Sequence, residues 1–384
     1  MTRRRTGKHP LKKARDGAEG AARSTTKQGR PRHSERAPKP DRNKDEQAVR
    51  TRVPRAQKAI STPQAPQALM GDIHPISLLE LTGWDNYALL DTGDGQKLEA
   101  YGPKRIIRPE PQALWTPRLA TAEWNAADAV FTGNTDEEGP GRWQIQRGDD
   151  GHWVQSFGDV RYVCRFTSFR HVGVFPEQAA HWAWMSERIA RRVAAGQTPK
   201  VLNLFGYTGV ASLVAAAAGA EVTHVDASKK AVSWARENQA LSELADRPIR
   251  WLVDDAVKFV EREVRRENRY DGVLLDPPKY GRGPKGEIWH LFEELPGLLR
   301  SIEKILTPEA DFVVLTAYSI RASFIAMEEL LRSVLGGRLA SGSIEAGELV
   351  LRETDMAGLP SRRLSTSLYA RWSSNISLQE SVND

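Results

Sequence analysis

Short apolar runs alternate with helix-forming stretches between Pro199 and Trp289. Val201–Phe205 and Tyr270–Leu275 have the length and composition of buried parallel strands. Between them, Val210–Ala218 is predicted to be a helix, and Glu221–Val225 a second buried strand. This alternation of strands and helices predicts an α/β domain with a mostly parallel sheet, and we place that domain at residues 171–384.

Residues 71–170 show a different pattern. Short alternating runs such as Ile76–Leu81 and Arg161–Phe166 are divided by turn residues, of which Gly93-Asp94-Gly95 is typical. This pattern predicts a small β-rich domain. Tryptophan side chains gather in it, and they would either pack in a core or stack on nucleobases: Trp84, Trp115, Trp124, Trp143 and Trp153.

Further elements are expected toward the end of the chain. Ile288–Ile305 is predicted to be a helix that is bent or broken at Pro296, because proline removes a backbone donor. Glu348–Arg352 and Thr366–Trp372 are predicted to be antiparallel strands that close the sheet.

Residues 1–70 are predicted to be a disordered basic tail, because they offer too little apolar surface to offset chain entropy. Residues 1–60 contain 19 lysines and arginines against 6 acidic residues, a net charge of +13, whereas the whole chain has +6. Such a tail either tethers the protein to RNA through phosphate contacts or is a solvated segment without a fixed partner.

The single cysteine, Cys164, excludes an intramolecular disulfide and is compatible with a reducing compartment. No apolar run approaches the ~20 residues of a membrane span, and no secretory signal is recognisable. We therefore expect a cytoplasmic protein with no membrane partner. We also expect no metal site.

The first candidate site is the turn Gly206-Tyr207-Thr208-Gly209, followed twenty residues later by Asp226. Glycines let the backbone approach a ligand, the helix N-terminus offers N–H groups, and the acid can accept ribose hydroxyls. The turn lacks the dinucleotide fingerprint, so it suits a ligand without a pyrophosphate, such as S-adenosyl-L-methionine. The alternative is an ordinary turn of an α/β protein.

The second candidate site is Asp276-Pro277-Pro278-Lys279-Tyr280, directly after a buried strand. Two prolines make this loop stiff, and ligands of open α/β sheets bind at this end of the strands. The following Gly-rich segment contains Arg282 and Lys285, which would contact a phosphate of the substrate or belong to a flexible lid.

At this point the chain resembles the class I S-adenosylmethionine-dependent methyltransferases. It is most similar to bacterial large-subunit ribosomal RNA methyltransferases with L-N-L-F-x-Y-T-G and D-P-P-K-F motifs, here Leu202–Gly209 and Asp276–Tyr280. The resemblance is sharp over roughly 199–290 and does not cover the tail. It implies a Rossmann-like, mostly parallel, seven-stranded methyltransferase sheet, with a smaller N-terminal domain that helps choose the substrate.

The resemblance also assigns roles to residues. Phe205, Gly206, Tyr207, Thr208, Gly209 and Asp226 would bind the cofactor, with Asp255 at the adenine and Phe175 and Gln178 at the pocket border. Asp255 could instead be a helix N-cap, and one residue can do both. Phe175 and Gln178 could equally be a packed linker.

Two departures from related enzymes bear on the chemistry. Cytosine C5 enzymes place a cysteine nucleophile where this chain has Ala317-Tyr318-Ser319, so the resemblance favours an amine or ring nitrogen. Asp276 and the Pro277 carbonyl would then accept the two N–H bonds of an exocyclic amine. Amino methyltransferases have an aromatic residue where Lys279 stands, so the base-stacking residue would be Tyr280.

The predicted function is methyl transfer to a base of RNA, with ribosomal RNA as the expected partner. Methylation of a small molecule or a protein is the alternative among enzymes, and a non-catalytic RNA-binding assembly factor is the alternative outside them. A hydride-transferring Rossmann enzyme is disfavoured by the missing fingerprint glycines. No motif specifies the target nucleotide or the oligomeric state.

Overall fold

The structure is a computed structural model that describes residues 76–80, 82–133, 140–145, 151–318, 320–356 and 358–375. The chain divides into two units, Met1–Gly71 and Asp72–Asp384, and every described residue belongs to the second. The predicted basic tail, residues 1–70, therefore lies outside the described residues.

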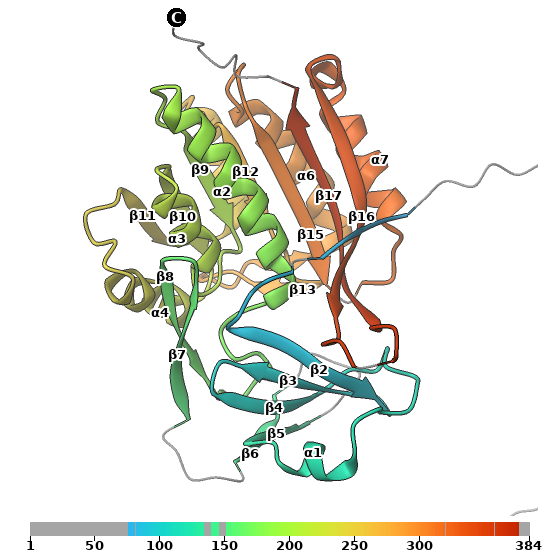
Figure 1. The fold of residues 1–384 in the computed structure, drawn as a ribbon. Helices are drawn as coiled ribbons and strands as arrows, with labels where there is room; N and C mark the ends of the chain where they lie inside the picture. The colour runs from blue at the N-terminus through green and yellow to red at the C-terminus, as the bar shows by residue number, and fades with distance from the viewer. Residues whose placement is uncertain are drawn as a thin grey trace, which may run out of the picture. The chain divides into compact units, whose positions relative to one another are not determined.

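The largest element of the second unit is an eight-stranded sheet (Figure 1). In spatial order it consists of β1 (Ser77–Leu79), β16 (Gly342–Arg352), β17 (Arg363–Ser374), β15 (Phe312–Tyr318), β12 (Gly272–Leu275), β9 (Lys200–Leu204), β10 (Glu221–Asp226) and β11 (Ile249–Val253). The neighbours from β15 to β11 are parallel, and β17 runs antiparallel to both β15 and β16. The predicted α/β fold with a mostly parallel sheet is thus confirmed.

Helices bury both faces of this sheet. Successive side chains of a strand point to opposite faces, so Val313 and Leu315 belong to one core while Phe312 and Val314 belong to the other. The first core includes α5 (Ala256–Arg265), α6 (Leu291–Ile305) and α7 (Phe324–Val334). The second includes α2 (Ala179–Ala194) and α3 (Val210–Ala217), and α4 (Lys229–Leu241) packs beside α3.

The region before α2 is rich in β-structure, as the alternating pattern predicts. A five-stranded sheet runs in the order β2 (Tyr87–Gly93), β3 (Gln96–Tyr101), β4 (Lys104–Pro109), β5 (Ala129–Thr132) and β6 (Arg142–Ile145), with α1 (Thr121–Asn125) before β5. An antiparallel pair, β7 (His152–Phe157) and β8 (Val160–Arg165), follows. The five tryptophans pack against hydrophobic clusters, which supports a core role: Trp84, Trp115, Trp124, Trp143 and Trp153.

The main sheet has one strand more than the seven that the family resemblance implies. The extra strand is β1, which pairs in parallel with β16 from Ser77↔Gly347 to Leu79↔Leu349. The pattern over Ile76–Leu81 predicted a strand of the small β-rich domain, and the structure corrects this to the edge of the main sheet. Three residues are too few for a sequence pattern to indicate their partner.

The predicted helix Ile288–Ile305 also needs a correction at its start. Ile288–His290 is a short strand, β14, which forms an antiparallel hairpin with β13 (Tyr280–Arg282). The helix α6 begins at Leu291 and continues through Pro296 without a break. None of the helices in the described ranges is long and apolar enough to span a membrane.

A buried ion-pair cluster joins the five-stranded sheet to the main sheet. Arg362, between β16 and β17, donates to Asp91 Oδ1 at 2.6 Å and to the Thr92 carbonyl at 2.8 Å. The same guanidinium donates to both carboxylate oxygens of Glu353 at 3.0 and 2.8 Å. Asp91 and Glu353 are almost fully buried, so loss of Arg362 would leave two buried carboxylates without this partner where the two sheets meet.

Candidate active site

The turn after β9 is shaped by close packing. A Cβ atom on Gly206 would lie 2.4 Å from His224 Cε1, and one on Gly209 would lie 2.8 Å from Ala235 Cβ. Gly209 also has φ = +79°, a left-handed conformation that glycine adopts without strain. Both predicted glycines are therefore required at their positions.

The other residues of this turn either line the cavity or hold the turn in place. Phe205 and Tyr207 have positive φ values of 56° and 50°, and both side chains line the cavity described below. Non-glycine residues in this region of φ store backbone strain of order 1 kcal/mol, a frequent feature of functional sites. Thr208 is buried, and its hydroxyl donates to the Gly173 carbonyl at 2.6 Å. This hydrogen bond joins the turn to the segment that precedes α2.

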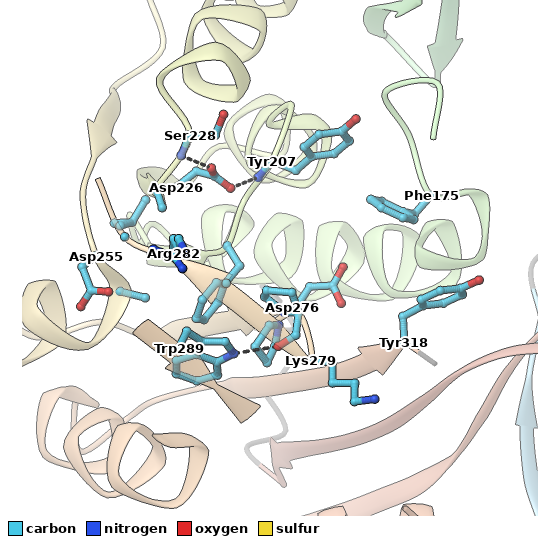
Figure 2. A pocket seen from close by; sticks show the side chains of 18 of the residues that line it. Phe175, Tyr207, Asp226, Ser228, Asp255, Asp276, Lys279, Arg282, Trp289 and Tyr318 are labelled. Carbon is cyan, nitrogen blue, oxygen red and sulfur yellow. Dashed lines mark hydrogen bonds between the residues drawn. The ribbon is translucent and has the colours of Figure 1, made fainter. Parts of the chain in front are cut away.

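Asp226, at the end of β10, is held by two backbone groups. Its Oδ2 accepts from the Tyr207 N–H at 2.9 Å and its Oδ1 accepts from the Ser228 N–H at 2.7 Å (Figure 2). Burial raises the pKa of this carboxyl above its ordinary value, and the two backbone donors act in the opposite direction. A carboxylate fixed in this way can accept hydrogen bonds from ribose hydroxyls without reorganising.

Asp254 and Asp255 follow β11. Asp255 Oδ1 accepts from the Lys258 N–H at 2.9 Å and caps helix α5, which is the alternative role that the sequence left open. Asp254 is paired with Arg262 and accepts from the Asp255 N–H at 2.9 Å. Both residues also line the cavity, so capping does not exclude Asp255 from ligand contact.

The loop Asp276-Pro277-Pro278 leaves the carboxyl end of β12. Asp276 Oδ1 accepts from the Thr316 hydroxyl at 2.7 Å, and Oδ2 accepts from Gln178 Nε2 at 3.1 Å. Trp289 Nε1 donates to the Pro278 carbonyl at 2.7 Å. Groups from three other elements therefore hold the loop in one conformation.

A cavity of about 330 Å³ opens where these loops meet, a volume suited to a small-molecule ligand. Figure 2 shows Asp226 and Asp255 at one end, Phe175 and Tyr318 at the other, and Asp276 between them. The predicted site residues that line the cavity are Phe175, Gln178, Phe205, Tyr207, Asp226, Asp255, Asp276, Pro277, Pro278, Lys279 and Arg282.

The other predicted residues lie outside this lining. Gly206, Thr208 and Gly209 build the turn, and Gly206 borders a smaller adjoining cavity. Tyr280 is 48% exposed and packs against His290, with ring centroids 5.1 Å apart. Lys285 is exposed in the β13–β14 connection, where its backbone N–H donates to Glu287 Oε2 at 2.8 Å.

The structure adds lining residues that the sequence motifs did not indicate: His171, Glu177, Ser228, Trp289, Tyr318 and Ser367. For two of them a sequence signal existed. Asp226-Ala227-Ser228 is an Asx-type turn, in which the acid accepts the N–H two residues on. Tyr318 ends a buried strand, at the edge of the sheet where ligands bind.

Comparison with known proteins agrees with this geometry. Residues 180–308 match the family described as "Conserved hypothetical protein 95". The ribosomal RNA large subunit methyltransferase K/L of Shewanella sp. (strain MR-4) is 30% identical over 160 residues, which are 40% of this chain and 21% of that protein. The chain thus spans about a fifth of the length of this curated relative.

Two solved structures match a larger part of this chain than the curated relative does. The SAM-dependent methyltransferase from Agrobacterium tumefaciens is 52% identical, with a TM-score of 0.73, over 78% of this chain and 94% of that one. SMU.776, whose structure contains S-adenosylhomocysteine (SAH), has a TM-score of 0.53 over 74% of this chain and 75% of that one. Its identity of 15% indicates a shared fold alone.

The residues present fit the cofactor that these enzymes use. The turn after β9, the fixed carboxylate of Asp226 and a cavity of suitable volume lie together at the carboxyl edge of the sheet. The cofactor is S-adenosylmethionine, and with 52% identity over nearly the full length of the Agrobacterium enzyme, the chain belongs to the class I S-adenosylmethionine-dependent methyltransferases.

Proposed function

We propose that this enzyme methylates a base of RNA, and that the RNA is ribosomal. The observation that carries the proposal is the Asp276 carboxylate, which is held in the cavity beside the exposed cations Lys279 and Arg282. A carboxylate accepts hydrogen bonds from an amine, whereas exposed cations favour a phosphate backbone. The relatives in Shewanella, named as ribosomal RNA methyltransferases, support the same substrate class.

The geometry around Asp276 suits a nitrogen nucleophile. S-adenosylmethionine supplies an electrophilic methyl group when it is bound. Thr316 and Gln178 each donate one hydrogen bond to the Asp276 carboxylate, which sets its orientation in the cavity. We expect an amine of the target base to donate to Asp276 and to the Pro277 carbonyl, and these two contacts would orient its nitrogen for in-line transfer.

A carbon target that requires a thiolate is disfavoured. Cys164 is the only cysteine of the chain, lies fully buried in β8 and does not line the cavity. Burial also raises the pKa of its thiol, which suppresses the reactive thiolate. The segment Ala317-Tyr318-Ser319, where cytosine C5 enzymes have their cysteine, contains no thiol that could form the covalent adduct at the base.

The test is transfer of tritiated methyl groups from S-adenosylmethionine to RNA extracted from a strain that lacks the protein. We expect label in that RNA and little in RNA from the parent strain, whose sites are already methylated. Nucleoside mass spectrometry would then identify the modified base. Label in protein or in a small-molecule fraction, with none in RNA, would establish the alternative enzyme classes, and absence of label from all three would favour a non-catalytic role.

Deletion of residues 1–60 should weaken RNA binding and flatten its salt dependence, because the segment has a net charge of +13 and fewer counterions would be released. Base preference should not change, since phosphate contacts are independent of sequence. The measurement is RNA affinity across a series of salt concentrations for the full chain and the deletion variant. Equal slopes for the two proteins would show that this segment does not contact RNA.

A further inference from the structure

A row of aromatic side chains lines the cavity from the cofactor turn to the end of β15. The ring of Phe175 lies 5.6 Å from that of Tyr207 and 4.6 Å from that of His171. His171 in turn meets Tyr318 edge-on, with centroids 6.2 Å apart and an interplanar angle of 86°. All four residues line the cavity, and Figure 2 shows Phe175 and Tyr318 at the end away from Asp226.

The orientation of Tyr318 is fixed by a chain of buried polar contacts. Arg170 Nη2 donates to the Tyr318 hydroxyl at 2.8 Å, and the guanidinium carbon lies 5.4 Å from the ring centroid. Arg108 Nη1 donates to the Arg170 carbonyl at 3.3 Å, and Glu99 accepts two hydrogen bonds of 2.7 Å from Arg108. A ring held in this way loses little conformational entropy when a ligand stacks on it.

The charges around this end of the cavity are balanced. Three buried cations and three buried acids gather here: Arg108 is paired with Glu99, Lys97 is paired with Glu110 at 3.2 Å, and Arg170 and Glu177 line the same small cavity. Burial, with the nearby Arg108, Arg170 and Lys97, lowers the pKa of His171 well below its ordinary value, so its ring is neutral at neutral pH. These surroundings suit an uncharged planar ring better than a phosphate or a carboxylate.

The hairpin β13–β14 turns Tyr280 away from the cavity, whereas Tyr318 lines it. Gly281 pairs with Trp289, and Tyr280 pairs with His290. Neighbouring residues of a strand point to opposite faces, so Trp289 is buried against Phe205 while Tyr280 is turned outward. Tyr280, the stacking residue expected from the sequence, therefore does not line the cavity.

We propose that His171, Phe175 and Tyr318 form the subsite for the target base, with the Tyr318 ring as the surface on which an uncharged nucleobase stacks. The inference rests on the proposed RNA methyltransferase function. In it, Tyr318 contacts the substrate, whereas Arg170 is a positioning residue that acts through the Tyr318 hydroxyl. The five-stranded sheet thus contributes to the site through Arg108 and Glu99, which hold Arg170.

The first test compares Tyr318→Leu, Tyr318→Ala and Tyr318→Phe in the full chain, with RNA from the deletion strain as substrate. Loss of the ring should raise KM for RNA by about tenfold or more, as removal of a base-stacking ring typically does. The affinity for SAH should not change. Tyr318→Phe keeps the ring and loses only the bond from Arg170, so its KM should rise by less than that of Tyr318→Leu.

Tyr270→Leu is the matched control. Its hydroxyl also bonds to a charged side chain, Glu263 at 2.8 Å, but it lies before β12, at the opposite edge of the sheet. We expect this variant to lose thermal stability without a selective change in KM. An equal KM for RNA in Tyr318→Leu, Tyr270→Leu and the parent would overturn the subsite while leaving the RNA methyltransferase function intact.

A second test does not depend on RNA as the substrate. Saturation-transfer NMR with adenosine, guanosine, cytidine and uridine, in the presence of SAH, should detect transfer to the ring protons of at least one nucleoside. The signal should disappear in Tyr318→Leu and persist in Tyr318→Phe and Tyr270→Leu. Tyr318-dependent transfer without RNA methylation would refute the RNA function and retain the subsite, whereas no dependence on Tyr318 would refute the subsite.

Discussion

Replacement of Asp276 by alanine is expected to lower the rate of methyl transfer about a hundredfold or more while cofactor affinity is maintained. Asp276 is the carboxylate in the middle of the cavity, and its orientation is set by Thr316 and Gln178. Without it, the target amine loses the acceptor that aligns its nitrogen, and misalignment of reacting groups has costs of this size. The measurement is tritiated methyl transfer to RNA under saturating cofactor, with SAH affinity from calorimetry.

Cys164→Ala is the contrasting variant for the same assay. The side chain is fully buried away from the cavity and acts as a small apolar group, so we expect most of the methyl transfer to remain. Any loss should appear in thermal stability instead. An inactive Cys164→Ala enzyme that folds and binds cofactor, together with trapping of the parent on 5-fluorocytosine RNA, would instead identify cytosine C5 as the target.

Replacement of Asp226 by alanine should weaken the binding of S-adenosylmethionine or SAH by more than about tenfold, or about 1.4 kcal/mol. The Tyr207 and Ser228 N–H groups hold this carboxylate at the end of β10, beside the cavity. Loss of the side chain would remove the acceptor that we expect for the ribose hydroxyls, and it would leave those two donors without their partner. Calorimetric titration of the full chain measures the effect directly.

Glu221→Ala provides the comparison at the other end of the same strand. Glu221 is the first residue of β10, is exposed and does not line the cofactor cavity. Its replacement should leave cofactor affinity unchanged. If Asp226→Ala binds SAH as tightly as Glu221→Ala does, Asp226 has no part in the site.

The parallel core could be predicted because its signals are local. An apolar run, a glycine turn and a helix-forming stretch follow each other within a few residues, and β9 (Lys200–Leu204) and α3 (Val210–Ala217) begin within a residue of their predicted starts. The positions of Asp226 and Asp276 could be predicted in the same way. Both end parallel strands, and the carboxyl ends of such strands meet at one edge of the sheet.

At the far end of the cavity Phe175 was expected from the family resemblance, but its contact with His171, and that of His171 with Tyr318, could not be predicted in this way. His171 and Tyr318 are distant in the sequence, and neither belongs to a motif; tertiary packing alone brings them together. In the hairpin β13–β14 each strand has three residues, which is too short to reveal that Trp289 faces inward and Tyr280 outward. Sequence patterns therefore indicate the residues at the Asp226 end of the cavity better than those at the Tyr318 end.

The short strand β1 has a consequence for self-association. Exposed sheet edges offer unpaired backbone groups to a second chain, and proteins commonly protect them. Here Ser77–Leu79 pairs with the middle of β16, and a Cβ atom on Gly347 would lie only 1.9 Å from the Ser77 carbonyl oxygen. Glu80, directly after β1, forms ion pairs with Arg352 and Arg363. β1 therefore blocks this stretch of β16 from pairing with a strand of another chain. Glycine at position 347 makes this close pairing possible, because any side chain there would clash with the Ser77 carbonyl oxygen.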